Sequence, residues 1–192
     1  YSCRHGMGYT RISSEKDGIQ SEITYFIPKG KQYEIWKGTV KNTSATVKNL
    51  KLFSYVEFSC YIAKYDIECD WPRYFFDCRR KGNAIIFNPS DDFIREKRLL
   101  SYIATDLPIE GHDCARIEFL GTCRDESNPI AVERGVCGNS DINGDNACGS
   151  FCCPVSLAPG EEKSFVFTIG NACDEEEIKE QVASASDYPL VH

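Results

Sequence analysis

The sequence of 192 residues predicts a mostly β protein, an antiparallel β-sandwich followed by one helix near the C-terminus. Two observations indicate this fold class. Short segments that alternate apolar and polar residues recur along most of the chain, separated by turn residues such as Asp17-Gly18 and Pro159-Gly160. Only residues 174–185 have the spacing of a helix. We therefore expect one sandwich domain over residues 1–170 and a separate helical segment over residues 171–192.

The first part of the chain predicts a hairpin and two further strands. Asp17-Gly18 lies between the alternating segments 9–13 and 19–27, and Asp-Gly favours the tight turns of β-hairpins. A turn at Pro28 to Gly30 precedes a strand over 33–40, and a turn at Asn42 to Ser44 precedes a long strand over 47–58. Bulky residues occupy both faces of this last strand, so we expect it to be central and covered on both sides.

The second part of the chain predicts shorter elements. A loop rich in aromatic and charged residues spans 63–80, and 111–121 is expected to be irregular with one helical turn. Strands are expected over 84–87, 99–106, 129–133, 150–157 and 163–169. The helix over 174–185 begins with four acids, Asp174 to Glu177, which favour a helix N-terminus, and Ile178 and Val182 lie on one face.

Composition and charge exclude several classes of function. A formal net charge of −7 argues against nucleic acid or an anionic membrane as a partner, because phosphate groups attract basic surfaces. No apolar run reaches the roughly 20 residues that span a bilayer. The first residues lack the apolar segment of a signal peptide, so we expect a cytoplasmic protein. Eleven cysteines are an odd number, and reduced thiols that serve as small hydrophobic residues are favoured over disulfides.

The residues that could ligate a metal form only incomplete sets. His112 with Cys114 is one possible half-site, and Cys148 with Cys152 and Cys153 is another, but paired zinc motifs are absent and buried or incidental cysteines are favoured. Residues 141–146 begin like a calcium-binding loop. Glycine then falls at its fourth position and Cys152 at its twelfth, so a polar loop is favoured. We predict no metal, and no motif indicates a self-sufficient active site.

The loop that contains Trp71 is the exception, because it combines flat apolar rings with directional polar groups. Sugars stack their C–H faces on aromatic rings and hydrogen-bond with charged side chains. The candidate residues are Asp66, Asp70, Trp71 and Arg73, beside Tyr74, Phe75 and Phe76. The alternative is a loop whose aromatic rings cap the core.

Several segments, taken together, resemble glycoside hydrolase family 94, the family of cellobiose, cellodextrin, laminaribiose and chitobiose phosphorylases. The matching segments are YSCRHGMGYT at 1–10, YFIPKG at 25–30, EIW at 34–36, VKN at 40–42, LFSYVEF at 52–58, PIEGHD at 108–113, FLG at 119–121 and LAPGE at 157–161. They occur in the family's order and cover nearly the whole chain.

The resemblance implies the N-terminal sandwich of such an enzyme, a supersandwich of the galactose-mutarotase-like type. A linker helix would lead from it to an (α/α)₆ barrel that carries the catalytic residues, so the segment alone is expected to be inactive. The implied reaction is inverting: inorganic phosphate, the co-substrate, attacks a β-linked disaccharide or oligosaccharide and releases an α-sugar 1-phosphate, without an organic cofactor. A homodimer is implied, with the sandwich near the partner's active site.

One stretch of the family's pattern bears on the sugar pocket. Asp66 and Arg73 keep the places of two family residues, and the family's Arg lies near the substrate pocket. Asp70-Trp71-Pro72 replaces Asn-Phe-Gln, which puts standard cellobiose or chitobiose specificity in doubt. The second hypothesis is a non-catalytic carbohydrate-binding or assembly module with the same fold.

Overall fold

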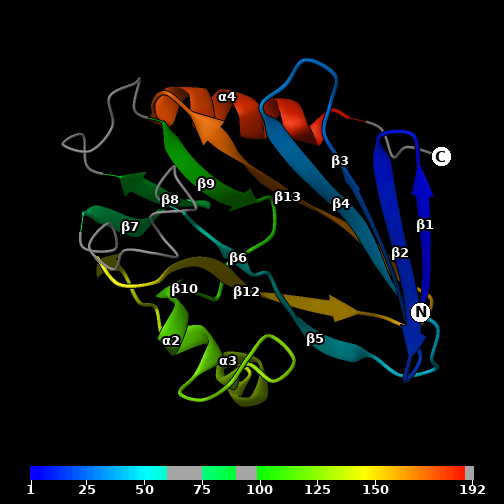
Figure 1. Ribbon diagram of the computed structural model, residues 1–192. Coiled ribbons are helices and arrows are strands. Elements are labelled where there is room, and N and C mark those ends of the chain that lie inside the picture. The colour runs from blue at the N-terminus through cyan, green and yellow to red at the C-terminus, as the bar shows by residue number, and fades with distance from the viewer. Residues whose placement is uncertain (60–74, 90–98, 189–192) are drawn as a thin grey trace.

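The computed structural model describes residues 1–59, 75–89 and 99–188, which form two antiparallel sheets and three helices (Figure 1). This confirms the predicted sandwich with a C-terminal helix. The larger sheet has the order β1-β2-β3-β4-β13-β9-β8-β7-β11. Its strands are β1 (Ser2–Gly6), β2 (Tyr9–Lys16), β3 (Ile19–Phe26), β4 (Tyr33–Asn42), β13 (Glu162–Ala172), β9 (Leu100–Thr105), β8 (Ala84–Pro89), β7 (Phe76–Lys81) and β11 (Ile142–Asn143).

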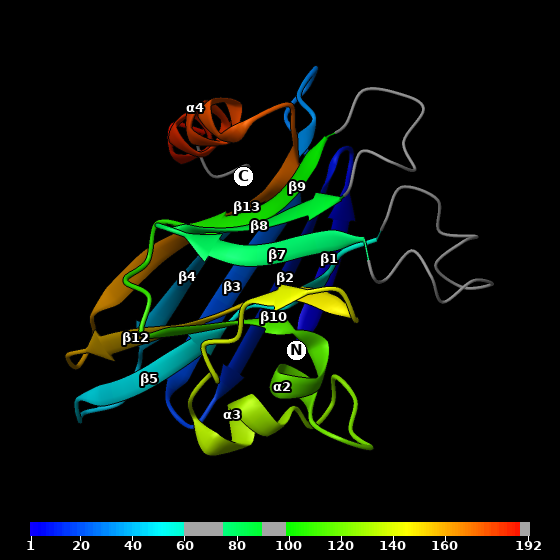
Figure 2. The same ribbon diagram turned by 90° about the vertical axis from the view of Figure 1, so that its left-hand side faces the viewer.

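The smaller sheet has the order β10-β12-β5, and β6 also pairs with β12. Its strands are β10 (Gly111–Ala115), β12 (Ala147–Leu157), β5 (Lys48–Phe53) and β6 (Val56–Glu57). Figures 1 and 2 show helix α4 (Glu175–Ser186) above the large sheet, and α2 (Arg116–Leu120) and α3 (Ile130–Arg134) below the small one. Among the described residues, no helix is long and apolar enough to cross a membrane.

The predicted hairpin is β2 and β3, and the turn residues explain it. Asp17 and Gly18 have φ values of 53° and 76°, the left-handed pair that a two-residue turn between twisted strands requires. Lys16 pairs with Ile19 across the turn.

The main core lies between the sheets and is built by alternation along the strands. From β12, Phe151, Cys153, Val155 and Leu157 point inward. They meet a second set of buried residues from the larger sheet, namely Val40, Phe76, Cys78, Ile85, Phe87, Ile103, Phe165 and Phe167. Burial of this apolar surface is the main force that holds the two sheets together.

Helix α4 covers the outer face of the large sheet. Ile178 is buried against Tyr102, Ala104 and Ala172, and the Tyr102 hydroxyl donates to Gln181 Oε1 at 2.7 Å. The side chain of Asp174 accepts from the Glu177 N–H at 2.9 Å, so the predicted helix start is a capped N-terminus.

The prediction of one long central strand over 47–58 is wrong. The segment is two strands, β5 and β6, broken at Ser54, whose hydroxyl accepts from the Phe151 N–H at 3.1 Å. Both strands pair with β12, and β5 ends the strand order of the small sheet. The large side chains on both faces of this segment are nevertheless covered. Leu50 and Leu52 pack into the main core, and Phe53 packs against the layer of α2 and α3.

Two further assignments are corrected by the structure. Residues 129–133 were expected to form a strand but belong to α3, which begins after Pro129 and ends at Gly135 with a left-handed φ of 70°. Residues 111–121 contain a fully buried strand, β10, before the helical turn α2. Three short strands were not predicted at all: β1, β11 and β7, the last of which lies where a loop was expected.

Candidate functional site

The four residues predicted to contact sugar, Asp66, Asp70, Trp71 and Arg73, lie outside the described residues. The structure therefore does not test this prediction. It places the residues that flank their segment: Ser59 follows β6, and Phe75 precedes β7.

The described residues form a groove of about 780 Å³. Two residues of its lining lie beside parts of the chain that the structure does not describe: Ser59 directly precedes residues 60–74, and Leu99 directly follows residues 90–98. The remaining lining comes from the turn before β4, from β4, β9 and β13, and from β6 with the residue after it: Ile27, Lys31, Gln32, Tyr33, Glu34, Val56, Glu57, Phe58, Ser101, Ile169, Gly170 and Asn171. Apolar side chains next to carboxylates and amides are a surface that suits a sugar.

Glu57 is the best-anchored polar group of the groove. Its Oε1 accepts from the Tyr55 hydroxyl at 2.5 Å and from Arg116 Nε at 2.8 Å. Partial burial raises the pKa of the Glu57 carboxyl, but these hydrogen bonds and the guanidinium charge outweigh burial and hold the pKa below its ordinary value. Glu57 is therefore an ionised acceptor at neutral pH.

Glu34, on β4, also lines the groove. Its Oε1 accepts from Trp36 Nε1 at 3.0 Å, which fixes the carboxylate. Two carboxylates that accept hydrogen bonds can orient sugar hydroxyls. We assign Glu34 and Glu57 no catalytic role.

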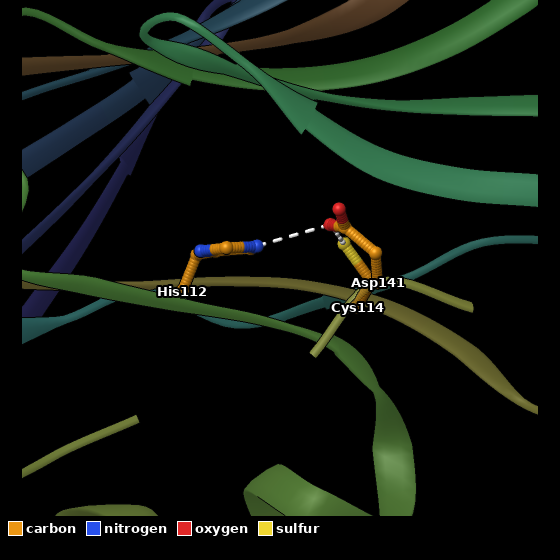
Figure 3. Close-up of side chains that lie close together, drawn as sticks. All are labelled: His112, Cys114 and Asp141. Atoms are coloured by element: carbon orange, nitrogen blue, oxygen red, sulfur yellow. Dashed lines mark hydrogen bonds and ion pairs between the residues drawn. The ribbon is translucent and has the colours of Figure 1, made fainter. Parts of the chain in front are cut away.

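The second candidate site forms around His112 and Cys114, the half-site seen in the sequence (Figure 3). The structure adds Asp141, whose Oδ1 lies 3.0 Å from His112 Nε2 and 3.7 Å from Cys114 Sγ. One ligand atom from each residue lies within 4.8 Å of the other two. Asp141 had been considered only as the start of a calcium-type loop, and nothing in its spacing pointed to His112.

The other half-site considered, Cys148 with Cys152 and Cys153, is not assembled in the structure. Cys148 and Cys152 belong to the apolar cluster under α2 and α3, whereas Cys153 points into the main core. Adjacent residues of a strand project to opposite faces, so Cys152 and Cys153 cannot ligate one ion together. All nine cysteines in the described part of the chain are free thiols, and six of them are buried, as expected of small hydrophobic residues.

The fold and the groove define a β-supersandwich domain. A solved polysaccharide lyase structure has the same fold, with a TM-score of 0.52 at 12% identity over 91% of this chain and 23% of that one. The chain belongs to the glycosyl hydrolase 94 family, because the model of that family's supersandwich domain matches residues 1–188. The resemblance found in the sequence is thereby confirmed.

Several curated relatives of the chain are phosphorylases. An N,N'-diacetylchitobiose phosphorylase from Vibrio proteolyticus is 35% identical over 178 residues, which cover 88% of this chain and 21% of that protein. A solabiose phosphorylase from Paenibacillus borealis is 29% identical over 175 residues, 91% of this chain and 22% of that protein. The chain thus spans about a fifth of the length of these relatives.

Proposed function

We propose that the chain is the N-terminal domain of an inverting glycoside phosphorylase. The observation that carries the proposal is the family match over residues 1–188, together with relatives that are phosphorylases about five times longer. In this reaction phosphate attacks the anomeric carbon of a β-linked disaccharide or oligosaccharide. The glycosidic C–O bond breaks, the acceptor oxygen takes a proton, and an α-sugar 1-phosphate leaves.

The domain's own part in this reaction is to shape the sugar pocket. The groove supports this assignment, because Ser59 in its lining directly precedes, in the sequence, the segment that holds Asp66, Asp70, Trp71 and Arg73. The side chains of Glu57 and Glu34, each held by hydrogen bonds, offer fixed oxygen acceptors to hydroxyl groups. The bond-breaking residues are proposed to lie in an (α/α)₆ barrel that α4 and the residues after it lead into.

The test is phosphorolysis by the protein in its full native length. Cellobiose, laminaribiose, cellodextrins and N,N'-diacetylchitobiose are each incubated with inorganic phosphate, and sugar 1-phosphate is measured. We expect one of these sugars to yield α-sugar 1-phosphate, and its anomeric proton in NMR reports the inversion. If no member of the panel yields it, the proposal fails for these β-glucosides.

The proposal includes a cytoplasmic homodimer, with the sandwich against the partner subunit. Light scattering on the full-length protein is expected to give twice the mass of one chain. A non-catalytic carbohydrate-binding or assembly module remains the second hypothesis. Sugar binding by the full-length protein without any phosphorolysis would favour it.

A further inference from the structure

We propose that His112, Cys114 and Asp141 form a binding site for one zinc ion. The three side chains point toward one another between the two sheets (Figure 3). His112 and Cys114 are buried, and the Asp141 side chain is 51% exposed. Imidazole, thiolate and carboxylate are the three protein groups that bind zinc.

The fold assembles this site through the alternation of β10. His112 and Cys114 are two residues apart and share the face that looks toward the larger sheet. Asp113 points to the opposite face, where its carboxylate accepts from the N–H groups of Gly138 and Ser140 at 3.0 and 3.3 Å.

These bonds hold the segment that carries Asp141. The Cys114 N–H donates to the Ser140 carbonyl at 2.9 Å, so residue 141 follows directly beside β10. On its other side, Asp141 Oδ1 accepts from the Arg80 N–H of β7 at 3.1 Å. The carboxylate is thus fixed between a strand of the small sheet and a strand of the large one.

The spacing of the ligand atoms fits a tetrahedral ion. Bonds of about 2.0–2.3 Å from zinc to nitrogen, oxygen and sulfur place pairs of ligand atoms about 3.3–3.6 Å apart. The Nε2–Oδ1 distance is 3.0 Å and the Sγ–Oδ1 distance is 3.7 Å. All three ligand atoms lie within 4.8 Å of one another, so side-chain movement brings them onto one ion, and the Asp141 side chain is open to solvent.

The donor set selects zinc over calcium. Calcium takes six or more oxygen ligands, and this cluster offers one carboxylate. Asn143, which would supply the next oxygen of a calcium loop, accepts instead from Arg79 Nη2 at 2.9 Å. A soft sulfur and an imidazole nitrogen are the ligands that zinc prefers over the hard cations.

The same three residues do not form a nucleophile with its base. In a Cys-His-Asp relay the imidazole stands between thiol and carboxylate and uses one nitrogen for each. Here His112 Nε2 and Cys114 Sγ both meet the same carboxylate oxygen, and no partner of His112 Nδ1 is found in the described residues. The rival interpretation is a simple polar cluster held by the His112–Asp141 pair.

The test uses the full-length protein, purified under reducing conditions without an added metal and stripped with a chelator. Zinc is titrated in competition with a chromophoric chelator. We expect one zinc ion per chain from this site. We also expect the Tm of the sandwich to rise by about 5–10 °C when free zinc is about 100-fold above Kd. Cobalt substitution is expected to give a thiolate-to-metal charge-transfer band.

Three variants keep the shape of the cluster and remove one ligand each: His112→Gln, Cys114→Ser and Asp141→Asn. Each is expected to weaken zinc binding by about 10-fold or more, and Cys114→Ser is expected to abolish the charge-transfer band. Each variant can still hydrogen-bond, so a polar cluster without zinc predicts no change in metal affinity.

Two cysteine variants are the matched controls. Cys148→Ser keeps a donor for the Asp113 carbonyl, which the thiol contacts at 3.5 Å, and lies outside the cluster. Cys78→Ser alters a buried thiol of the facing sheet, which donates to the Cys148 carbonyl at 3.7 Å. Both are expected to retain the zinc. Failure to bind one zinc at this site, or loss of zinc in a control while Asp141→Asn retains it, would overturn the proposal.

Discussion

Glu57 shows how two neighbours can keep a half-exposed carboxylate charged. The hydrogen bonds from Tyr55 and Arg116 stabilise the ionised form against the opposing effect of burial. Because the folded pKa lies below the unfolded one, this stabilisation is complete above the ordinary glutamate value of 4.5 and is lost as the pH falls through the folded pKa.

We expect Glu57→Gln to cost stability at neutral pH and little under acid conditions. The side chain is 48% exposed, so solvent screening limits the cost to below about 1 kcal/mol. Urea unfolding of both proteins at about pH 7 and about pH 3 measures the difference, which should shrink as the carboxyl protonates. An equal difference at both pH values would show that the carboxylate charge contributes nothing.

The cysteines fall into two groups of different reactivity. Burial raises the pKa of the Cys153 thiol to about 12, whereas Cys3 and Cys123 are exposed. Since the thiolate is the nucleophile, iodoacetamide should modify Cys3 and Cys123 in the native protein and Cys153 only after unfolding. Peptide mapping by mass spectrometry checks this order. Early modification of Cys153 would mean that the sheets open readily.

The sequence predicts only part of the His112–Cys114–Asp141 cluster. His112 and Cys114 stand out because alternate residues of a strand share a face. Asp141 does not, since 26 residues separate it from Cys114 and tertiary hydrogen bonds, among them those of the Asp113 carboxylate and of the Cys114 N–H, bring its segment back. Tertiary hydrogen bonds of this kind leave no local pattern. For the sugar-contacting residues, the expectation stays a prediction.

At the scale of elements, local chemistry decides which segments could be predicted. Asp17-Gly18 specifies its hairpin because both residues tolerate positive φ. Asp174 specifies the start of α4 in the same local way. Segment 129–133 was mistaken for a strand because five residues are too few to show a period, and Pro129 and Gly135 were the better signals.

The turn between β2 and β3 gives a prediction with a matched control. Gly18 has a φ of 76°, and a Cβ there would lie 2.8 Å from Ser44 Cβ. Gly82 has a φ of 64° with open space around it. Gly82→Ala should therefore cost about 1–2 kcal/mol through backbone strain alone. Gly18→Ala should cost about 1 kcal/mol more, because the methyl group also clashes.

Denaturant unfolding of the two alanine variants separates the effects. The midpoint of Gly18→Ala should be the lower one, with an unchanged slope. If both variants lose the same stability, Ser44 moves away at no cost and only the backbone strain matters.

For the whole molecule, the sequence predicts the architecture better than the arrangement of its strands. Alternation and turns suffice for a sandwich, and the ordered family segments add its type. β5 is the last strand in the order of the small sheet. The segment after it breaks at Ser54, whose hydroxyl accepts a hydrogen bond from the Phe151 N–H of β12. Such a break depends on the strand with which the segment pairs, and that strand is far away in the sequence. The alternation of apolar and polar residues within one segment therefore does not predict it.

The proposed division of labour gives the last prediction. If the sandwich shapes the sugar pocket and another domain breaks the bond, changes at Trp71 and Arg73 should act on substrate binding. We expect Trp71→Ala and Arg73→Ala in the full-length protein to raise KM for the disaccharide by about 10-fold or more. The loss of one charged hydrogen bond or one stacking ring has that magnitude.

The measurement is steady-state phosphorolysis with separate determination of kcat and KM. Arg134→Ala is the control, because Arg134 is exposed on α3 and does not line the groove. It should leave both constants unchanged. A fall in kcat with unchanged KM would instead place the Trp71–Arg73 loop in the transition state of the reaction. Unchanged constants in both loop variants would remove the loop from the pocket and leave the groove around Glu57 as the domain's contact with sugar.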